Sequence, residues 1–102
     1  MFDKSRYLTS GVREKIPPIL QILLWNCIDR KIEKKVPLDY LQIFKLEATK
    51  DESGKLKQKI THSQEQPESA DTYFMESSAP VIAKLYAIDD GNHSTMLLAE
   101  EY

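Results

Sequence analysis

Residues that the common catalytic and cofactor-binding motifs require are scarce in this sequence. Among its 102 residues are one cysteine, two histidines and three glycines. A single cysteine cannot form an internal disulfide, and there is no pair of cysteines to bind zinc. Three separate glycines cannot build the glycine-rich loop that holds the phosphates of a nucleotide. These absences disfavour disulfide-stabilised proteins, cysteine-bound zinc sites and ordinary nucleotide-binding enzymes.

The sequence also lacks a hydrophobic run long enough to cross a membrane. Residues 19–28 include eight apolar residues, but Gln21 and Asn26 interrupt them and Pro17 and Pro18 precede them. A transmembrane helix needs about 20 predominantly apolar residues. No secretory signal is predicted either, because no small-residue cleavage site follows the run. We therefore expect a cytoplasmic protein with no membrane partner, and a lone cysteine fits a reducing compartment.

The composition is that of a folded chain. Apolar residues make up 41% of the sequence, charged residues 29% and aromatic residues 9%. A disordered chain has fewer aromatic residues, and 102 residues can bury one hydrophobic core without disulfides or metal ions. We expect a single domain over residues 1–102.

Charge is unevenly distributed along the chain. Residues 1–62 contain 13 Lys and Arg against 8 Asp and Glu, whereas residues 63–102 contain one Lys against 8 acidic residues. The two halves therefore carry net charges of +5 and −7. This asymmetry predicts either a basic surface for an anionic partner or head-to-tail pairing of subunits. Alternatively, the two halves fold together and their charges intermix on the surface.

One helix is predicted from Pro17 and Pro18 to about Lys35, before Pro37. Proline is tolerated in the first turn of a helix, and a later proline ends it. At about 100° per residue, two apolar stripes run along this helix. We expect the main stripe to pack on a sheet; it contains Ile16, Ile19, Leu20, Leu23, Leu24 and Cys27. The second stripe needs another covering partner and consists of Trp25, Ile28 and Ile32.

The remaining segments alternate as β-strands do. A first short strand is predicted over residues 6–9, before the helix, and a Ser10-Gly11 turn ends it. Four or five strands are predicted after the helix, over residues 38–49, 55–64, 72–76, 81–88 and 94–99. Turn residues at 51–54 and 89–92 predict two hairpins, and the polar residues 63–71 predict a surface loop. We expect the C-terminal strand to be interior or covered. The pattern predicts an α+β fold with one N-terminal helix packed on a mainly antiparallel sheet of four to six strands.

Reactive residues lack the spacing of known sites. His62 and His93 could bind a metal ion together with the carboxylates near His93, but no His-x-x-x-His spacing is present, and residues 89–92 do not match a calcium loop. Cys27 lies within the main apolar stripe, where burial raises the pKa of a thiol and makes it a poor nucleophile. We predict no catalytic residue, no metal site and no cofactor. These patterns leave a metal-dependent enzyme as the least supported class.

Two functions remain open. In the first, the protein is a non-enzymatic interaction or oligomerisation module that contacts a second copy or another protein through Trp25, Ile28 and Ile32, because tryptophan is enriched at the centres of interfaces. Alternatively, a hairpin or the C-terminal strand of the same chain covers this stripe.

The second function is nucleic-acid binding through the basic hairpin. Lys45, Lys55, Lys57 and Lys59 would form a cationic track beside aromatic rings of Tyr7, Tyr40 and Phe44. The sequence pI of 5.7 disfavours a dedicated nucleic-acid-binding protein. Aromatic residues on one strand face are also commonly core residues.

Several motifs resemble those of one bacterial family. They are Arg6-Tyr7-Leu8-Thr9 with Gly11-Val12, Ile16-Pro17, Leu24-Trp25, Ile28-Asp29, the segment from Asp39 to Phe44, Gln64-Glu65-Gln66-Pro67, Ile88-Asp89-Asp90-Gly91 and the segment from Ser94 to Tyr102. Together they cover nearly all of the chain, which resembles a domain-of-unknown-function family of short proteins from staphylococci and related Firmicutes. The resemblance implies a cytoplasmic bacterial protein and assigns a role to no residue.

Overall fold

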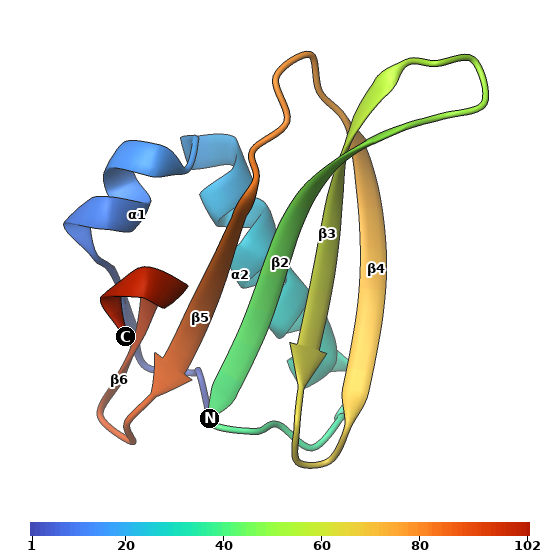
Figure 1. The fold of residues 1–102 in the computed structure, drawn as a ribbon. Helices are drawn as coiled ribbons and strands as arrows, with labels where there is room; N and C mark the ends of the chain where they lie inside the picture. Colours follow the sequence, from blue (N-terminus) through green and yellow to red (C-terminus); the bar gives the residue numbers. More distant parts are fainter.

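The computed structural model describes residues 1–102 as a six-stranded sheet with two helices on one of its faces (Figure 1). The elements in chain order are β1 (Ser5–Leu8), α1 (Ser10–Lys15), α2 (Pro18–Glu33), β2 (Leu41–Lys50), β3 (Leu56–Gln64), β4 (Ser69–Glu76), β5 (Ala83–Asp89), β6 (His93–Leu98) and a 3-10 turn, η1 (Ala99–Glu101). The predicted α+β fold, a helix packed on a mainly antiparallel sheet, is confirmed. Neither helix combines the length and the apolar character needed to cross a membrane.

The strand order across the sheet is β1-β6-β5-β2-β3-β4. Both predicted hairpins are present, because β3 pairs with β2 and β6 pairs with β5 in antiparallel fashion. The next strand in the chain, β5, does not pair with β4. After β4 the chain returns over the end of the sheet, and β5 pairs with the free side of β2 (Figure 1). β1 joins β6 as the one parallel pair. The C-terminal strand β6 is therefore interior, as predicted.

Helix α2 begins and ends where its prolines predict, but its buried face differs from the predicted one. Ile19, which we placed in the main stripe, is 62% exposed. The face that meets the sheet instead contains Leu20, Gln21, Leu24, Cys27, Ile28 and Lys31. Because Ile28 and Lys31 are buried, the centre of the buried face is rotated about the helix axis, away from Ile19. Relative to the predicted stripe, the rotation exceeds about 45°, at about 100° per residue. The N-terminal segment contacts α2 through Arg6, which binds Asp29, and it adds the buried side chain of Phe2 to the core.

Two predicted turns have more structure than expected. The Ser10-Gly11 turn is the start of α1, capped by the hydroxyl of Thr9, which accepts a hydrogen bond from the backbone N–H of Val12 at 3.3 Å. The loop predicted over residues 63–71 is a short turn, because β3 continues to Gln64 and β4 begins at Ser69. In both places, side-chain hydrogen bonds extend regular structure into polar sequence.

Three buried glutamines hold the irregular connections against the sheet. Gln58 exchanges two hydrogen bonds with the backbone of Val81 in the β4–β5 connection, at 2.7 and 3.0 Å. Gln64 donates to the carbonyls of Pro37 and Pro67, at 2.9 and 2.8 Å. The side-chain amide of Gln42 donates to the side-chain oxygen of Gln64 at 2.8 Å. These amides satisfy buried backbone groups that no strand pairs.

His62 extends this network into the core. Its ring is fully buried and stacks on Phe44, with 4.5 Å between the ring centroids. Nε2 donates to the side-chain oxygen of Gln42 at 2.6 Å, while Nδ1 has no hydrogen-bond partner. A proton added at Nδ1 would therefore be buried without an acceptor. Burial, together with the nearby ammonium of Lys31, lowers the pKa of His62 to about 3.

We expect the protein to lose stability when the pH falls from 6 to 5. The unfolded chain binds a proton at His62 with a pKa of about 6.5, whereas the folded chain does not until about pH 3. The contribution of His62 is therefore fully present above pH 6.5 and is lost as the pH falls, by up to about 1.4 kcal/mol per pH unit. Chemical denaturation at each pH measures this slope. It should disappear in His62→Gln and persist in His93→Gln; an equal slope in both variants would contradict the assignment.

Candidate functional site

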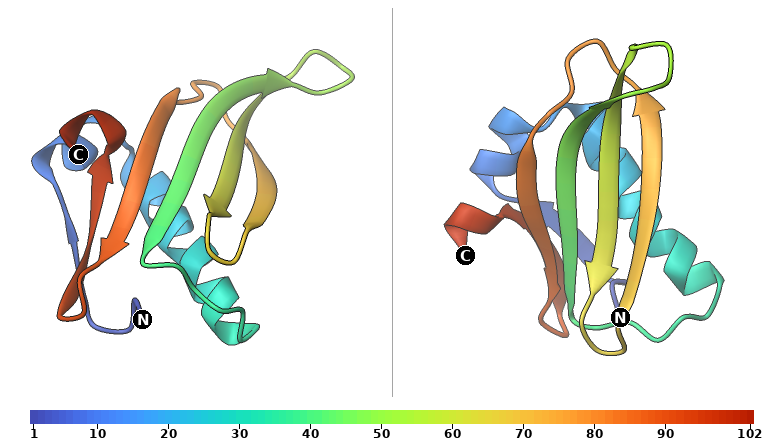
Figure 2. Two further views of the ribbon diagram at one scale, coloured as in Figure 1. Left: turned by 60° about the horizontal axis from the view of Figure 1, so that its bottom comes forward. Right: turned by 45° about the vertical axis from the view of Figure 1, so that its right-hand side comes forward.

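A groove of about 520 Å³ lies between α2 and strand β4. Figure 2 shows that α2 crosses the helix-bearing face of the sheet obliquely. A helix with its side chains is about 10 Å wide and strands are about 4.8 Å apart, so one helix cannot cover every strand. The groove is lined by Leu23, Asn26, Cys27, Asp29, Arg30 and Glu33 from α2, by Ile60 from β3, and by Tyr73, Phe74 and Met75 from β4.

The groove is an apolar surface with a charged rim and not a reactive centre. Burial raises the pKa of the Cys27 thiol to about 11, so the thiol is neutral and acts as a small apolar side chain. On the rim, the guanidinium of Arg30 lies over the ring of Tyr73 at 5.6 Å and makes no ion pair within the chain. The groove therefore presents apolar side chains between charged groups at its rim.

Buried Lys31 ties the start of β4 to α2. Its ammonium donates to the hydroxyl of Ser69 at 3.0 Å and lies 3.9 Å from a carboxylate oxygen of Asp71. Burial lowers the pKa of Lys31, and the negative charge of Asp71 partly opposes this shift. The tether fixes the separation between the helix and the strand at one end of the groove.

Strand β4 forms one wall of the groove and one edge of the sheet. All eight of its residues pair with β3, without a bulge, and no strand pairs with its other side. Tyr73, Phe74 and Met75, in its second half, are uncharged, and Phe74 is 60% exposed. Natural edge strands are commonly shortened or interrupted by proline or bulges, which prevent pairing with other chains. The opposite edge, β1, has only four residues; β4 is twice as long and has neither proline nor a bulge, although it carries the charged residues Asp71 and Glu76.

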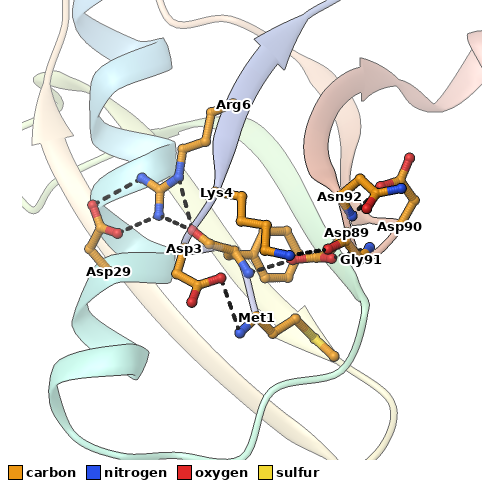
Figure 3. Close-up of polar contacts among 10 residues, drawn as sticks. Met1, Asp3, Lys4, Arg6, Asp29, Asp89, Asp90, Gly91 and Asn92 are labelled. Carbon is orange, nitrogen blue, oxygen red and sulfur yellow. Dashed lines mark hydrogen bonds and ion pairs between the residues drawn. The ribbon is translucent and has the colours of Figure 1, made fainter.

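The predicted contact stripe on α2 is not one exposed surface. Ile28 is fully buried, so the prediction that it contacts a partner is wrong. Trp25 is half-buried, because the guanidinium of Arg6 lies 5.0 Å from the centre of its ring. The same guanidinium binds both carboxylate oxygens of Asp29, at 2.6 and 3.2 Å, and the carbonyl of Phe2 (Figure 3). The same chain therefore covers much of this stripe, and of its three residues only Ile32 is exposed.

The predicted basic track and its aromatic platform separate in the structure. Lys45, Lys57 and Lys59 lie on the sheet face that carries no helix, whereas Lys55 lies in the β2–β3 loop and pairs with Glu76 at 3.1 Å. Phe44 is buried on the opposite face, under α2, so its predicted place in the platform is wrong.

The two histidines lie far apart in the fold. His62 is buried on the helix-bearing face, whereas His93 lies at the start of β6, 3.2 Å from Asp90. The carboxylate of Asp90 accepts hydrogen bonds from the backbone N–H groups of Asn92 and His93, which lower its pKa. No group of three or more His, Cys, Asp or Glu side chains is placed to hold a metal ion. The acidic residues at 89–92 stabilise the turn, because their carboxylates accept hydrogen bonds from its backbone N–H groups.

Sequence reasoning missed the residues of the β4 edge. The sequence predicts a short strand over residues 72–76. This strand lies at the edge of the sheet because β5 pairs with β2 and not with β4. Alternation identifies a strand and does not identify its neighbours. The uncharged run from Tyr73 to Met75 was the available signal, since an exposed edge with such a run is a pairing surface.

We expect Arg6→Ala to loosen the packing over Trp25. The substitution removes a two-point hydrogen bond to Asp29 and a cation–π contact, and should lower the free energy of unfolding by about 2 kcal/mol. Acrylamide should then quench the single tryptophan more strongly. Lys4→Ala is the matched control, because Lys4 in the same segment bonds only the exposed carbonyl of Gly91 (Figure 3). Unchanged stability and quenching in Arg6→Ala would rule out this role.

Comparisons with known proteins place the chain in a family. No curated protein matches the sequence. A crystal structure described as a protein of unknown function from Enterococcus faecalis is similar, with a TM-score of 0.78 and 29% identity; the match covers 98% of this chain and 92% of that one. The profile of a family described as staphylococcal protein of unknown function (DUF960) matches residues 5–101. Because the match spans nearly the whole chain, the protein belongs to this family of staphylococcal proteins of unknown function.

Proposed function

We propose that this protein is a non-enzymatic interaction module that dimerises by pairing the β4 strands of two copies. The observation that carries the proposal is an eight-residue edge strand, without proline or a bulge, beside an apolar groove. Free backbone N–H and C=O groups along an edge bind another strand, and an adjoining groove receives alternate side chains of that strand. The predicted role as an oligomerisation module is thus retained, but its surface moves from the Trp25 stripe to β4.

A second copy fits the charges at the centre of the paired segment. Two β4 strands related by a two-fold axis at Thr72 would pair antiparallel, with Thr72 opposite its own copy and Ala70 opposite Phe74. Asp71 would then lie opposite Tyr73 of the other copy, next to the Arg30 guanidinium that covers that ring. Each copy supplies one such carboxylate and one unpaired guanidinium, so the contact would form twice.

The helix flank beside the groove adds apolar area to this interface. Leu23 lines the groove and is half-buried there. A strand added to β4 would place its helix-side residues at the open side of the groove, on the side where Leu23 lies. Burial of apolar area contributes about 25 cal/mol per Å² before the cost of association.

We expect static light scattering to report a species of twice the chain mass of 11.8 kDa. Phe74→Glu should raise the dimer dissociation constant by about tenfold or more, because it places a charge within the paired segment. Next to Lys59 on β3, the new carboxylate is compatible with the folded monomer. Hydrogen exchange should show β4 amides becoming more protected as the protein concentration rises.

A charge exchange tests the register. Arg30→Asp and Asp71→Arg should each weaken the dimer, and the double variant should restore it. Ile82→Glu is the matched control, because Ile82 is 77% exposed but lies outside β4. A monomer at all concentrations, or a dimer that tolerates Phe74→Glu as well as Ile82→Glu does, would overturn the proposal.

A further inference from the structure

No helix covers the face of the sheet opposite α1 and α2 (Figures 1 and 2), and only the C-terminal Tyr102 packs there, against Tyr86. On β2, the buried residues Gln42, Phe44 and Leu46 point to the helices, so the residues between them point to this open face. The same alternation on the other strands follows from their registers. The open face therefore presents a row of side chains from each strand to the surroundings.

Lysines form one row on this face. Lys45 on β2 and Lys84 on β5 are direct cross-strand partners, and both are exposed. Directly opposed like charges destabilise a sheet. Lys59 on β3 lies diagonally beyond Lys45, since Lys45 is opposite Thr61.

Few acidic groups balance these lysines. Glu47 approaches Lys45 at 3.9 Å and is opposite Lys59, but Lys84 makes no ion pair. Glu76, the other acidic strand residue on the face, is bound to Lys55 in the loop. The lysine row thus keeps uncompensated positive charge, although the whole protein has a net charge of −2.

An apolar row lies next to the lysine row. Two residues from Lys84 along β5, Tyr86 is opposite Ile43 on one side and Leu97 on the other. Its ring lies 5.5 Å from the ammonium of Lys84, and the ring of Tyr102 meets it edge-on at 5.4 Å. A half-buried ring held beside a cation is the arrangement on which nucleic-acid bases stack.

We propose that this open face binds single-stranded nucleic acid. The sugar–phosphate backbone would follow the lysine row, and bases would stack along the row of Tyr86 and Ile43. A flat sheet suits separated bases and not a duplex, whose bases are stacked inside. An acidic polypeptide would form ion pairs with the lysines, but it would supply no bases to stack on the apolar row. This proposal does not rest on the β4 dimer.

Fluorescence anisotropy with labelled oligo(dT) and oligo(rU) of about 12 nucleotides tests it. We expect binding to both, with the logarithm of the binding constant falling against the logarithm of salt concentration with a slope of about −2, for three phosphate contacts. Lys45→Ala combined with Lys84→Ala should weaken binding by about tenfold or more. Because the change also removes the opposed like charges, thermal unfolding should show no loss of stability.

Two further variants separate charge from stacking. Tyr86→Leu retains every lysine but should weaken binding by about tenfold, because a stacked base contributes about 1–3 kcal/mol. Lys34→Ala combined with Lys35→Ala is the matched control, since these exposed lysines lie after α2 and away from the sheet face; binding should stay within about twofold. Full binding by the Lys45/Lys84 variant or by Tyr86→Leu, or equal affinity for poly-glutamate or duplex DNA, would overturn the proposal, as would no binding at low salt.

Discussion

One sixteen-residue helix has to shield one face of a six-stranded sheet, and most features of the molecule depend on this limit. Six strands at about 4.8 Å spacing extend over more than twice the width of a helix. On the β1 and β6 side, α1 and the buried Phe2 complete the cover. On the β4 side nothing does, which leaves the groove beside an edge strand. The opposite face has no helix at all, so both proposed binding surfaces lie where helical cover is missing.

Polar groups inside the molecule compensate for its irregular connections. Gln42, Gln58 and Gln64 give side-chain partners to segments that leave the sheet, including the β4–β5 connection that brings β5 beside β2. Without such partners, buried backbone groups in these segments would be left unpaired at a cost of about 1–3 kcal/mol each. His62 belongs to this network and has a structural role there. One of its ring nitrogens is hydrogen-bonded to the side-chain oxygen of Gln42, and the other has no hydrogen-bond partner.

Local patterns predicted much of the fold and little of the binding surfaces. Pro17 and Pro18 located the start of α2, and the turn residues 89–92 located a hairpin, because each acts on its immediate neighbours. The helix wheel misplaced Ile19 and Ile28, since apolar stripes on a helix do not specify which stripe meets the sheet. The lysines of the β2–β3 hairpin were identified, but Lys84 and Tyr86 were not. They join the same face because β5 pairs with β2, and the sequences of the two strands do not indicate this pairing.

By itself the sequence determined the class of the protein: an α+β fold, its main helix, its hairpins, and the family to which it belongs. These depend on periodicity, proline and turn chemistry, which act over a few residues. Only the tertiary structure decided that β4 is a bare edge, that Arg6 covers Trp25, and that Lys45 meets Lys84. Such contacts join residues distant in the chain, and they arise when apolar burial and backbone hydrogen bonding are satisfied for the whole sheet at once.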